Sequence, residues 1–546
     1  MKTNRSLSKT ARETHPALVF ALIFTAVFIL HWPLLRLPYF WDEAGYYIPA
    51  ARDLLLSGRL IPSTTLTNAH PPLIMAWLAL WWKLSGFTPA VTRMAMLLIS
   101  AFSLLGLFRL TERVANHQVA IASTVCTALY PVFYTQSSLA HLDLAAAGFT
   151  FWALREYVDD RRRLAVIWFA LAGLCKETAI LAPVALVAWE VIAPRLLPPA
   201  AIKRWCLFPA SRRSWLLLVP AAPLVLWFVY HFHETGRVFG NPEFFRYNVQ
   251  ATLHPLRVVL ALGMRLWQVL AYLHLYFLTF AAFLAMRSDP IRDAIVERPR
   301  IALPVQAVLG VVITTYVVAM AILGGAVLAR YMLPAVPLVI VICVSTVWRR
   351  IRRWREVVAF VCVMFVAGWF WNPPYGFSLE DNLAYRDYLV MHKKAEAFLE
   401  ARYPMARVLT AWPASDELSR PFLGYVDRPM RVVRIENFSL DQVVQASYAS
   451  EQYDVAFLFS TKYEPGFDPL GHWQPWEEVK TRFFGYHRDL PPQVAASLLD
   501  GKVIYSDKRQ GQWIAVVTIE RIQNAGKPPS SLMGVASSSS DGRSGF

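Results

Sequence analysis

The sequence is poor in charge and in cysteine, and each shortage excludes a class of protein. Charged residues make up 17% of the chain, whereas hydrophobic residues make up 56%. A soluble protein of 546 residues would carry more charge, and its apolar residues would form one buried core rather than many separate runs. The composition therefore predicts a polytopic membrane protein.

The five cysteines all lie in or beside apolar segments, and the polar part from residue 372 onward has none. A disulfide framework is therefore not expected there, although we place that part on an oxidising side of the membrane. The same part lacks a glycine-rich fingerprint for nucleotides and has no cluster with metal-ligand spacing. We therefore expect neither a nucleotide site nor a metal site in it.

Acidic residues are outnumbered by basic ones, and the formal net charge is +16. The Lys and Arg residues fall in short clusters between apolar runs, as expected when cytoplasmic loops carry the positive charge. This pattern argues against a nucleic-acid partner. The clusters, which we use to orient the chain, lie at 109–113, 161–163, 203–213, 287–300 and 349–355.

The first apolar run, residues 16–35, lacks a small-residue cleavage site, so we predict an uncleaved first helix with a cytosolic N-terminus. Residues 37–87 then form a large outer loop. Its segment PPLIMAWLALWW is shorter than the roughly 20 residues that a span needs, so we expect a helix on the outer surface. The apolar runs that follow predict about eleven spans in an α-helical polytopic membrane domain of residues 1–371. Within it, residues 231–255 are an expected outer loop, and residues 257–286 are expected to begin at the outer surface and then cross inward.

From residue 372 onward the composition is that of a soluble protein. A helical pattern over 381–403 precedes several strand-like segments, with a second helical stretch near 440–449. We predict a small soluble α/β domain, residues 372–523, on the outer face, followed by a flexible tail, residues 524–546. The expected strands lie within 406–412, 430–435, 453–460, 502–507 and 512–520.

Ionisable residues gather at the outer ends of the predicted spans. Polar groups along a path through the membrane would indicate transport, whereas acids and bases at one boundary indicate a reaction on a substrate that is partly in lipid. Aromatic residues surround the first acidic pair, as is typical of a membrane interface. The gathered residues are Asp42, Glu43, His70, Asp143, Lys176, Glu177, His231, His233, Glu234 and Arg330.

The acids among them also have a structural interpretation. Asp42 and Glu43 precede a helical segment, so they suit a helix N-cap and an acidic first turn. Asp143 suits a cap of the span that follows it, although His141 adds a second titratable group beside it.

The cationic residues have structural interpretations as well. His70 before two prolines suits a turn, and Lys176 with Glu177 suits a neutralised pair at a hairpin tip. Arg330 suits a snorkelling anchor, or a bidentate grip on a phosphate. His231 and His233 are only two residues apart in the expected outer loop, which is a weak metal signal.

Several short motifs follow one another in a characteristic order. The Asp–Glu pair after the first span is followed by HPPL at 70–73, LDLAAAGF at 142–149, GLCKETAILAP at 173–183 and RYMLPAVP at 330–337. Together they resemble the GT-C class of integral membrane glycosyltransferases. Within that class the chain is similar to the dolichyl-phosphate-mannose protein mannosyltransferases and the lipid A aminoarabinose transferases, most clearly over residues 36–190.

The resemblance implies transfer of a sugar from a polyprenyl-phosphate carrier to an acceptor on the outer face, with inversion at the anomeric carbon. It implies that Asp42 is the acceptor-activating base and Asp143 a second essential acid. His70 falls where the mannosyltransferases have histidine and the aminoarabinose transferases have lysine. The latter group's metal-binding acid has no clear equivalent, because Ala69 precedes His70, so a divalent metal cofactor is left open.

The chemistry of such a transfer suggests the remaining roles. A phosphate leaving group needs positive charge, which Arg330 and Lys176 would supply. The oxocarbenium character at the anomeric carbon would be stabilised by Glu43 and Asp143. With His70 and Glu177, these complete the residues that we predict to bind substrate.

Two other classes of function stay open. A lipid or sugar transporter would need polar groups within the spans, where Arg265 is the main example, and we assign Arg265 to a surface segment. A membrane-anchored binding protein would act through its outer α/β domain. The bacterial inner membrane is the location that fits best, with a lipid-linked sugar donor and a lipid, glycan or protein acceptor as partners.

Overall fold

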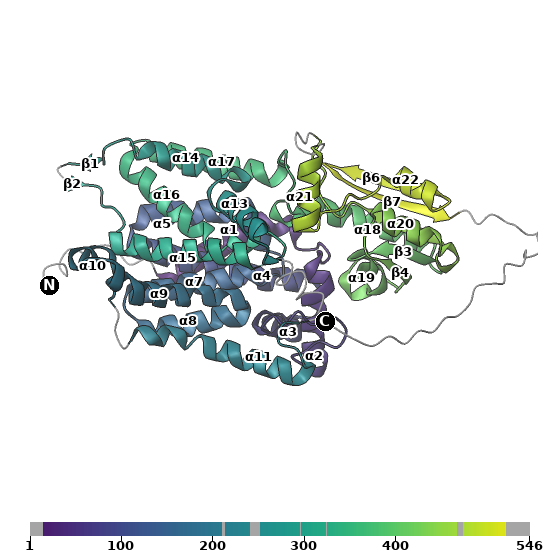
Figure 1. Ribbon diagram of the computed structural model, residues 1–546, viewed down its shortest axis with the longest axis horizontal. Coiled ribbons are helices and arrows are strands. Elements are labelled where there is room, and N and C mark those ends of the chain that lie inside the picture. Colours follow the sequence, from purple (N-terminus) through teal and green to yellow (C-terminus); the bar gives the residue numbers. More distant parts are fainter. Residues whose placement is uncertain are drawn as a thin grey trace, which may run out of the picture.

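The structure is a computed structural model that describes residues 15–209, 213–240, 252–294, 296–323, 325–466 and 473–519. The predicted tail, residues 524–546, lies outside these residues, as does the stretch 241–251 of the predicted outer loop. Figure 1 shows an elongated molecule in which long helices occupy one end and a β-sheet with its own helices occupies the other.

In the N-terminal two-thirds of the described chain, the regular secondary structure is helical apart from one short hairpin. Several begin with proline in the first turn, where the missing amide hydrogen costs no hydrogen bond, and Thr88 caps the longest helix by accepting from the amide of Val91. The helices are α1 (Pro16–His31), α2 (Ile48–Ser57), α3 (Leu73–Ser85), α4 (Pro89–Val114), α5 (His117–Leu129), α6 (Pro131–Gln136), α7 (Asp143–Val158), α8 (Arg162–Cys175), α9 (Leu181–Leu196), α10 (Pro199–Trp205), α11 (Ala221–Thr235), α13 (Pro255–Leu270), α14 (Leu275–Ala285), α15 (Leu303–Ile322), α16 (Val336–Arg350) and α17 (Trp354–Phe370). The hairpin pairs β1 (Arg292–Asp293) with β2 (Val296–Glu297).

Six helical segments of the described chain are long and apolar enough to cross a membrane, judged by length and composition. The count of about eleven spans therefore stays a prediction. The segment predicted to be a short surface helix does form a 13-residue helix, α3. The six segments are Pro16–Leu34, Pro89–Val114, Glu177–Leu196, Ser214–Thr235, Pro255–Ala285 and Leu303–Ile322.

Helix α4 lies at the centre of the bundle and packs closely on α7. At their crossing a Cβ on Gly148 would lie only 2.6 Å from the Cβ of Ser103, so no larger residue fits there. Arg93, near the start of α4, donates to the carbonyl of Ser138, just before α7. The two helices thus begin side by side, which brings Asp143 close to the loop that follows α1.

The stretch 257–286, expected to begin at the outer surface and then cross inward, consists of two helices. Leu273 and His274 have φ angles of 44° and 70°, which a continuous helix does not allow. Helix α13 therefore ends at Leu270 and α14 begins at Leu275.

Each of the five segments predicted as strands overlaps a strand of one sheet, with the order β4-β3-β5-β7-β6, and β6 extends beyond the predicted 502–507 at both ends. β3 is parallel to β4 and β5, whereas β7 is antiparallel to β5 and β6. The strands are β3 (Arg407–Ala411), β4 (Arg431–Ile435), β5 (Val455–Phe459), β6 (Gly501–Arg509) and β7 (Gln512–Ile519), and the helices of this part are α18 (Ala384–Arg402), α19 (Ala414–Ser419), α20 (Leu440–Ser447), α21 (Gln474–Phe484) and α22 (Pro492–Leu498).

This C-terminal part packs directly on the loop after α1. The hydroxyl of Tyr425 donates to the carbonyl of Tyr39 at 2.8 Å. The ring of Phe40 lies 5.3 Å from that of Tyr388, and the ring of Trp41 lies 5.4 Å from that of Trp412. The aromatic residues around the first acidic pair therefore fill an interface within the protein, and they hold that pair in place.

Candidate active site

Asp42 stands between this aromatic interface and the bundle. It directly precedes a π-helical turn, Glu43–Tyr47, that leads into α2, and its side chain makes no capping hydrogen bond to that turn. One carboxylate oxygen of Asp42 instead lies 2.5 Å from Nη2 of Arg330. The helix-cap interpretation of Asp42 therefore does not describe this structure.

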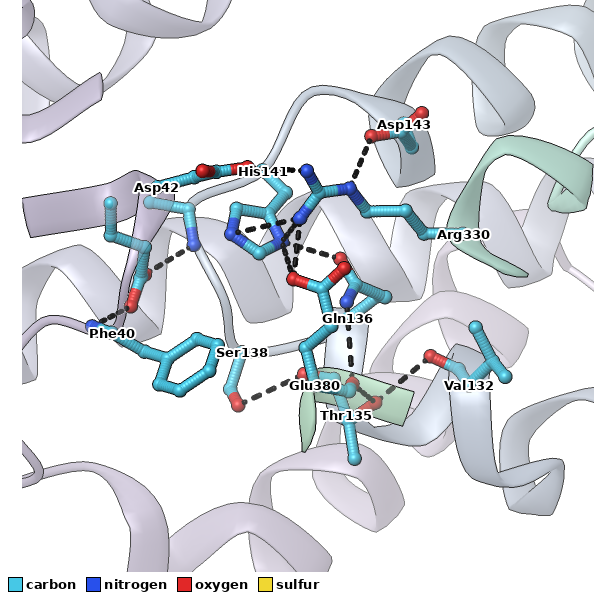
Figure 2. A network of polar contacts seen from close by, with 12 residues as sticks. Phe40, Asp42, Val132, Thr135, Gln136, Ser138, His141, Asp143, Arg330 and Glu380 are labelled. Carbon is cyan, nitrogen blue, oxygen red and sulfur yellow. Dashed lines mark hydrogen bonds and ion pairs between the residues drawn. The ribbon is translucent and has the colours of Figure 1, made fainter. Parts of the chain in front are cut away.

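Arg330 contacts three carboxylates at once (Figure 2). Its Nη2 meets Asp42 and its Nη1 meets Glu380, both at 2.5 Å, and its Nε lies 3.4 Å from Asp143. Arg330 comes from the single helical turn Ala329–Met332 before α16, and only 2% of its surface is exposed. It is therefore not a snorkelling anchor but the centre of a buried ionic cluster.

The carboxylates of this cluster differ in their access to solvent. The side chain of Asp42 is 23% exposed, whereas those of Asp143 and Glu380 are 4% and 5% exposed. Of the three acids on Arg330, Asp42 is therefore the one that an incoming molecule can reach without displacing protein.

Lys176 supplies the second cation, by contact with Asp143. Its Nζ lies 2.5 Å from Asp143 and 3.9 Å from the centre of the Tyr331 ring, a favourable cation–π distance. The predicted neutralisation of Lys176 by Glu177 is wrong, because Glu177 pairs with His70 at 2.8 Å. The two charged residues of the hairpin tip therefore pair with two different residues, which tertiary packing brings close to them.

Glu43 is oriented away from the cluster although it follows Asp42 in sequence. It is fully buried, forms a two-pronged ion pair with Arg93, and accepts from the amides of Phe40 and Ala140. Both carboxylate oxygens are thereby used within the protein. This geometry favours a positioning role for Glu43 over the predicted contact with the sugar.

Glu380 was missed by the sequence analysis. It lies in the turn Leu379–Asp381, between α17 and α18, where an acidic pair follows a span just as Asp42 and Glu43 do. That repetition is the signal that could have found it. Burial is the main cause that raises the pKa of Glu380 to about 8, with Asp42 adding to the rise and Arg330 opposing it.

The raised pKa of Glu380 favours its protonated form, while Arg330 and Lys176 pair with Asp42 and Asp143. His141, whose Nδ1 lies 3.0 Å from Arg330, favours its neutral form, because burial and the nearby Arg330 lower its pKa well below the ordinary value. A negatively charged ligand would therefore meet two cations at this cluster.

Arg265, which we assigned to a surface segment, lies in α13, before the helix break at Leu273 and His274. Its side chain is fully buried inside the bundle, where Nε donates to the carbonyl of Met320 and Nη1 to that of Leu328. Its guanidinium lies 5.6 Å from the centre of the Tyr331 ring. Because Lys176 and Arg330 also lie against that ring, three cations surround Tyr331.

His231, His233 and Glu234 do not join the cluster. They lie in α11, which extends to Thr235, so the expected outer loop begins later than predicted. Nε2 of His231 lies 3.0 Å from Thr67 Oγ1, whereas His233 is largely exposed.

The described residues do hold one group with the geometry of a metal site, His392, Glu396 and Glu417. Local spacing in the sequence could not indicate this group, because Glu417 is distant from the other two residues.

Residues 69–227 match the family model described as dolichyl-phosphate-mannose-protein mannosyltransferase. This range contains His70, Asp143 and Lys176 but neither Asp42 nor Arg330. No curated protein sequence matches the chain.

Two solved structures of ArnT from Cupriavidus metallidurans are similar to this one. The structure bound to undecaprenyl phosphate is 14% identical, the alignment covers 94% of this chain and 99% of that chain, and the TM-score is 0.51. The apo structure is also 14% identical, with coverage of 92% and 98% and a TM-score of 0.50. At this identity the likeness concerns the fold. The resemblance to the GT-C class of integral membrane glycosyltransferases is thus confirmed, by the family model over residues 69–227 and by the fold over nearly the whole chain.

Proposed function

We propose that the protein transfers a sugar from a polyprenyl-phosphate carrier to an acceptor at the cell envelope, with inversion at the anomeric carbon. The observation that carries this proposal is the buried cluster in which Arg330 and Lys176 meet Asp42 and Asp143. The ArnT structure that shares the fold contains undecaprenyl phosphate, which supports a carrier of that chemical class here. The sugar is a hexose or pentose, with mannose favoured by the family match.

The leaving group determines what the site must supply. When the bond between the anomeric carbon and the phosphate oxygen breaks, negative charge grows on the phosphate, and fixed cations in a dry site stabilise that charge strongly. Arg330 offers a planar fork of donors suited to a phosphate, and Lys176 offers a second positive charge. Because protonation of Glu380 removes one negative charge from the cluster, it lessens the repulsion of the arriving phosphate.

Asp42 is the proposed general base. It is the accessible acid of the cluster, and Arg330 holds its carboxylate in one orientation. An acceptor hydroxyl or amine that binds within hydrogen-bond reach passes its proton to Asp42 while its oxygen or nitrogen attacks the anomeric carbon. The phosphate departs on the carrier, and one displacement completes the reaction with inversion.

Asp143 and the pair His70–Glu177 complete the proposed site. Asp143 lies between Lys176 and Arg330, so it sets the separation of the two cations and adds negative charge near the developing oxocarbenium ion. His70 and Glu177 would contact the sugar or the acceptor. We place the site and the C-terminal part in the periplasm of a bacterium, with the N-terminus in the cytoplasm, as the basic clusters indicate.

The test is to offer the purified protein a panel of labelled polyprenyl-phosphate sugars and to measure which label leaves the carrier. We expect release of one sugar, at a rate that depends on Asp42. Binding of the lipid-linked sugars with no release from any of them, in the presence of envelope lipids, glycans and proteins, would contradict the proposal.

A further inference from the structure

A second group of ionisable side chains lies in the C-terminal part, separate from the residues that contact Arg330. His392 and Glu396 stand one helical turn apart on α18, and Glu417 lies on α19. One possible ligand atom from each of the three lies within 4.8 Å of the other two, and all three residues are 0% exposed. The proposed transferase mechanism uses none of them.

The polar atoms of this group are poorly satisfied by the protein. Within the described part of the chain, no hydrogen-bond donor meets the carboxylate oxygens of Glu396 or Oε1 of Glu417, and the group that Glu396 can share a proton with is the carboxyl group of Glu417. Nδ1 of His392 lies 2.7 Å from Oε2 of Glu417 and 3.6 Å from Oε1 of Glu396. Buried carboxylates without partners are rare in folded proteins, and each such atom calls for an unseen partner.

A positively charged partner would satisfy both carboxylates. Glu396 and Glu417 approach one another in a fully buried site, and the adjacent imidazole offers one ring nitrogen toward them. Two carboxylates and an imidazole neutralise a divalent cation, and nitrogen with carboxylate oxygen is a ligand set that zinc accepts. We propose that His392, Glu396 and Glu417 bind one divalent transition-metal cation, for which Zn²⁺ fits best.

The distances permit such binding with a small adjustment. Tetrahedral zinc with bonds of about 2.1 Å separates neighbouring ligand atoms by about 3.4 Å. The 3.6 Å between His392 and Glu396 already fits, whereas the 2.7 Å between His392 and Glu417 must widen. A change in the side-chain torsions of Glu417 can provide this widening without moving α19.

The position of the group indicates how a bound cation would affect the structure. Tyr388, one turn before His392 on α18, stacks on the His392 ring at 3.8 Å and packs on Phe40 and Trp41. A cation that joins α18 to α19 would therefore stiffen the support behind the loop that carries Asp42. This inference does not depend on the proposed transferase reaction.

The test uses the full-length protein, incubated with ZnCl₂, desalted, and analysed for metal by mass spectrometry. We expect about one tightly held zinc ion per chain in the unmodified protein, and a loss of at least about fivefold in Glu396→Gln and in Glu417→Gln. Glu400→Gln, one turn further along α18, is the matched control and should keep the zinc, because Glu400 caps the amides of Asp427 and Arg428 instead.

A second measurement covers variants that fail to fold. The unmodified protein should unfold at a lower temperature after EDTA treatment, and the unfolding temperature should rise again with added ZnCl₂, because a ligand that binds the folded state stabilises it. No retained zinc and no such shift would overturn the proposal in favour of two carboxyl groups that share a proton. Zinc that is retained in Glu396→Gln but lost in His70→Ala would also overturn it.

Discussion

The guanidinium of Arg330 lies 2.5 Å from the carboxylate of Asp42, although 288 positions separate the two residues. Arg330 also contacts the carboxylates of Glu380 and Asp143, and Asp42 directly precedes the π-helical turn Glu43–Tyr47. A base and a phosphate-binding cation are thereby held at a fixed separation.

Replacing Asp42 by Asn should stop sugar transfer while leaving the fold intact. The amide keeps the shape of the side chain but cannot accept a proton, and loss of a general base typically costs about 10²- to 10⁴-fold in rate. The measurement is release of labelled sugar, with thermal unfolding as the check on folding. Asp441→Asn, at an exposed position of α20, is the control and should behave as the unmodified protein. Unchanged turnover in Asp42→Asn would remove this residue from the mechanism.

Replacing the neighbouring Glu43 by Gln should lower the stability of the fold and leave the chemistry of transfer unchanged, which is the opposite of the effect expected for Asp42→Asn. The change leaves the buried Arg93 without its counter-charge, and breaking one side of a buried ion pair costs about 3–5 kcal/mol. We expect a marked fall in unfolding temperature and in the yield of folded protein. The molecules that remain folded should keep the pH profile of transfer, and a changed profile would indicate that Glu43 takes part in the reaction.

Arg330→Lys should weaken use of the donor more than it slows the bound donor. Lysine keeps the charge but loses the planar fork that reaches two partners at once. We expect the KM for the lipid-linked sugar to rise about tenfold or more, with a smaller change in kcat. Lys83→Arg, on the exposed end of α3, serves as a control for the chemistry of the exchange. An unchanged KM would argue against binding of the donor phosphate by Arg330.

The raised pKa of Glu380 should make the protein less stable as the pH rises. The folded-state pKa of about 8 lies above the ordinary value of 4.5, so between these limits the folded state keeps a proton that the unfolded state has released. Stability is therefore fully present below about pH 4.5 and declines up to about pH 8, by a slope on the order of 1 kcal/mol per pH unit. Glu380→Gln should flatten this decline.

The measurement is the unfolding temperature across that range. A residual slope should persist in Glu380→Gln below pH 7, because burial also raises the pKa of Asp381, to about 7. Glu400→Gln again provides the control and should keep the full slope. Equal slopes in Glu380→Gln and the unmodified protein would show that Glu380 is ionised at neutral pH.

Local patterns in the sequence predicted the helices, the strands and the first acidic pair. The positions of β3 to β7 follow from short runs of apolar and β-branched residues between turns, and α4 follows from a long apolar run. The break in α13 and α14 escaped prediction, because Leu273 and His274 are not residues that commonly adopt positive φ angles.

The ion-pair partner of each charged residue could not be predicted from the sequence. The adjacent residues Lys176 and Glu177 were expected to neutralise each other, yet each pairs with a residue distant in sequence. Glu43 was expected to act with Asp42, yet their side chains join two separate networks. Ion pairs in a buried site depend on which helices cross there, and no local spacing contains that information.

The sequence by itself determined that the chain is apolar, largely helical and rich in ionisable residues at the ends of its apolar runs, because hydrophobicity and charge act residue by residue. Only the tertiary structure decided that Arg330 meets Asp42, Asp143 and Glu380, and that His392 and Glu396 meet Glu417. The reason is physical: burial makes an unpaired charge costly, so the packing of distant helices must bring compensating groups together.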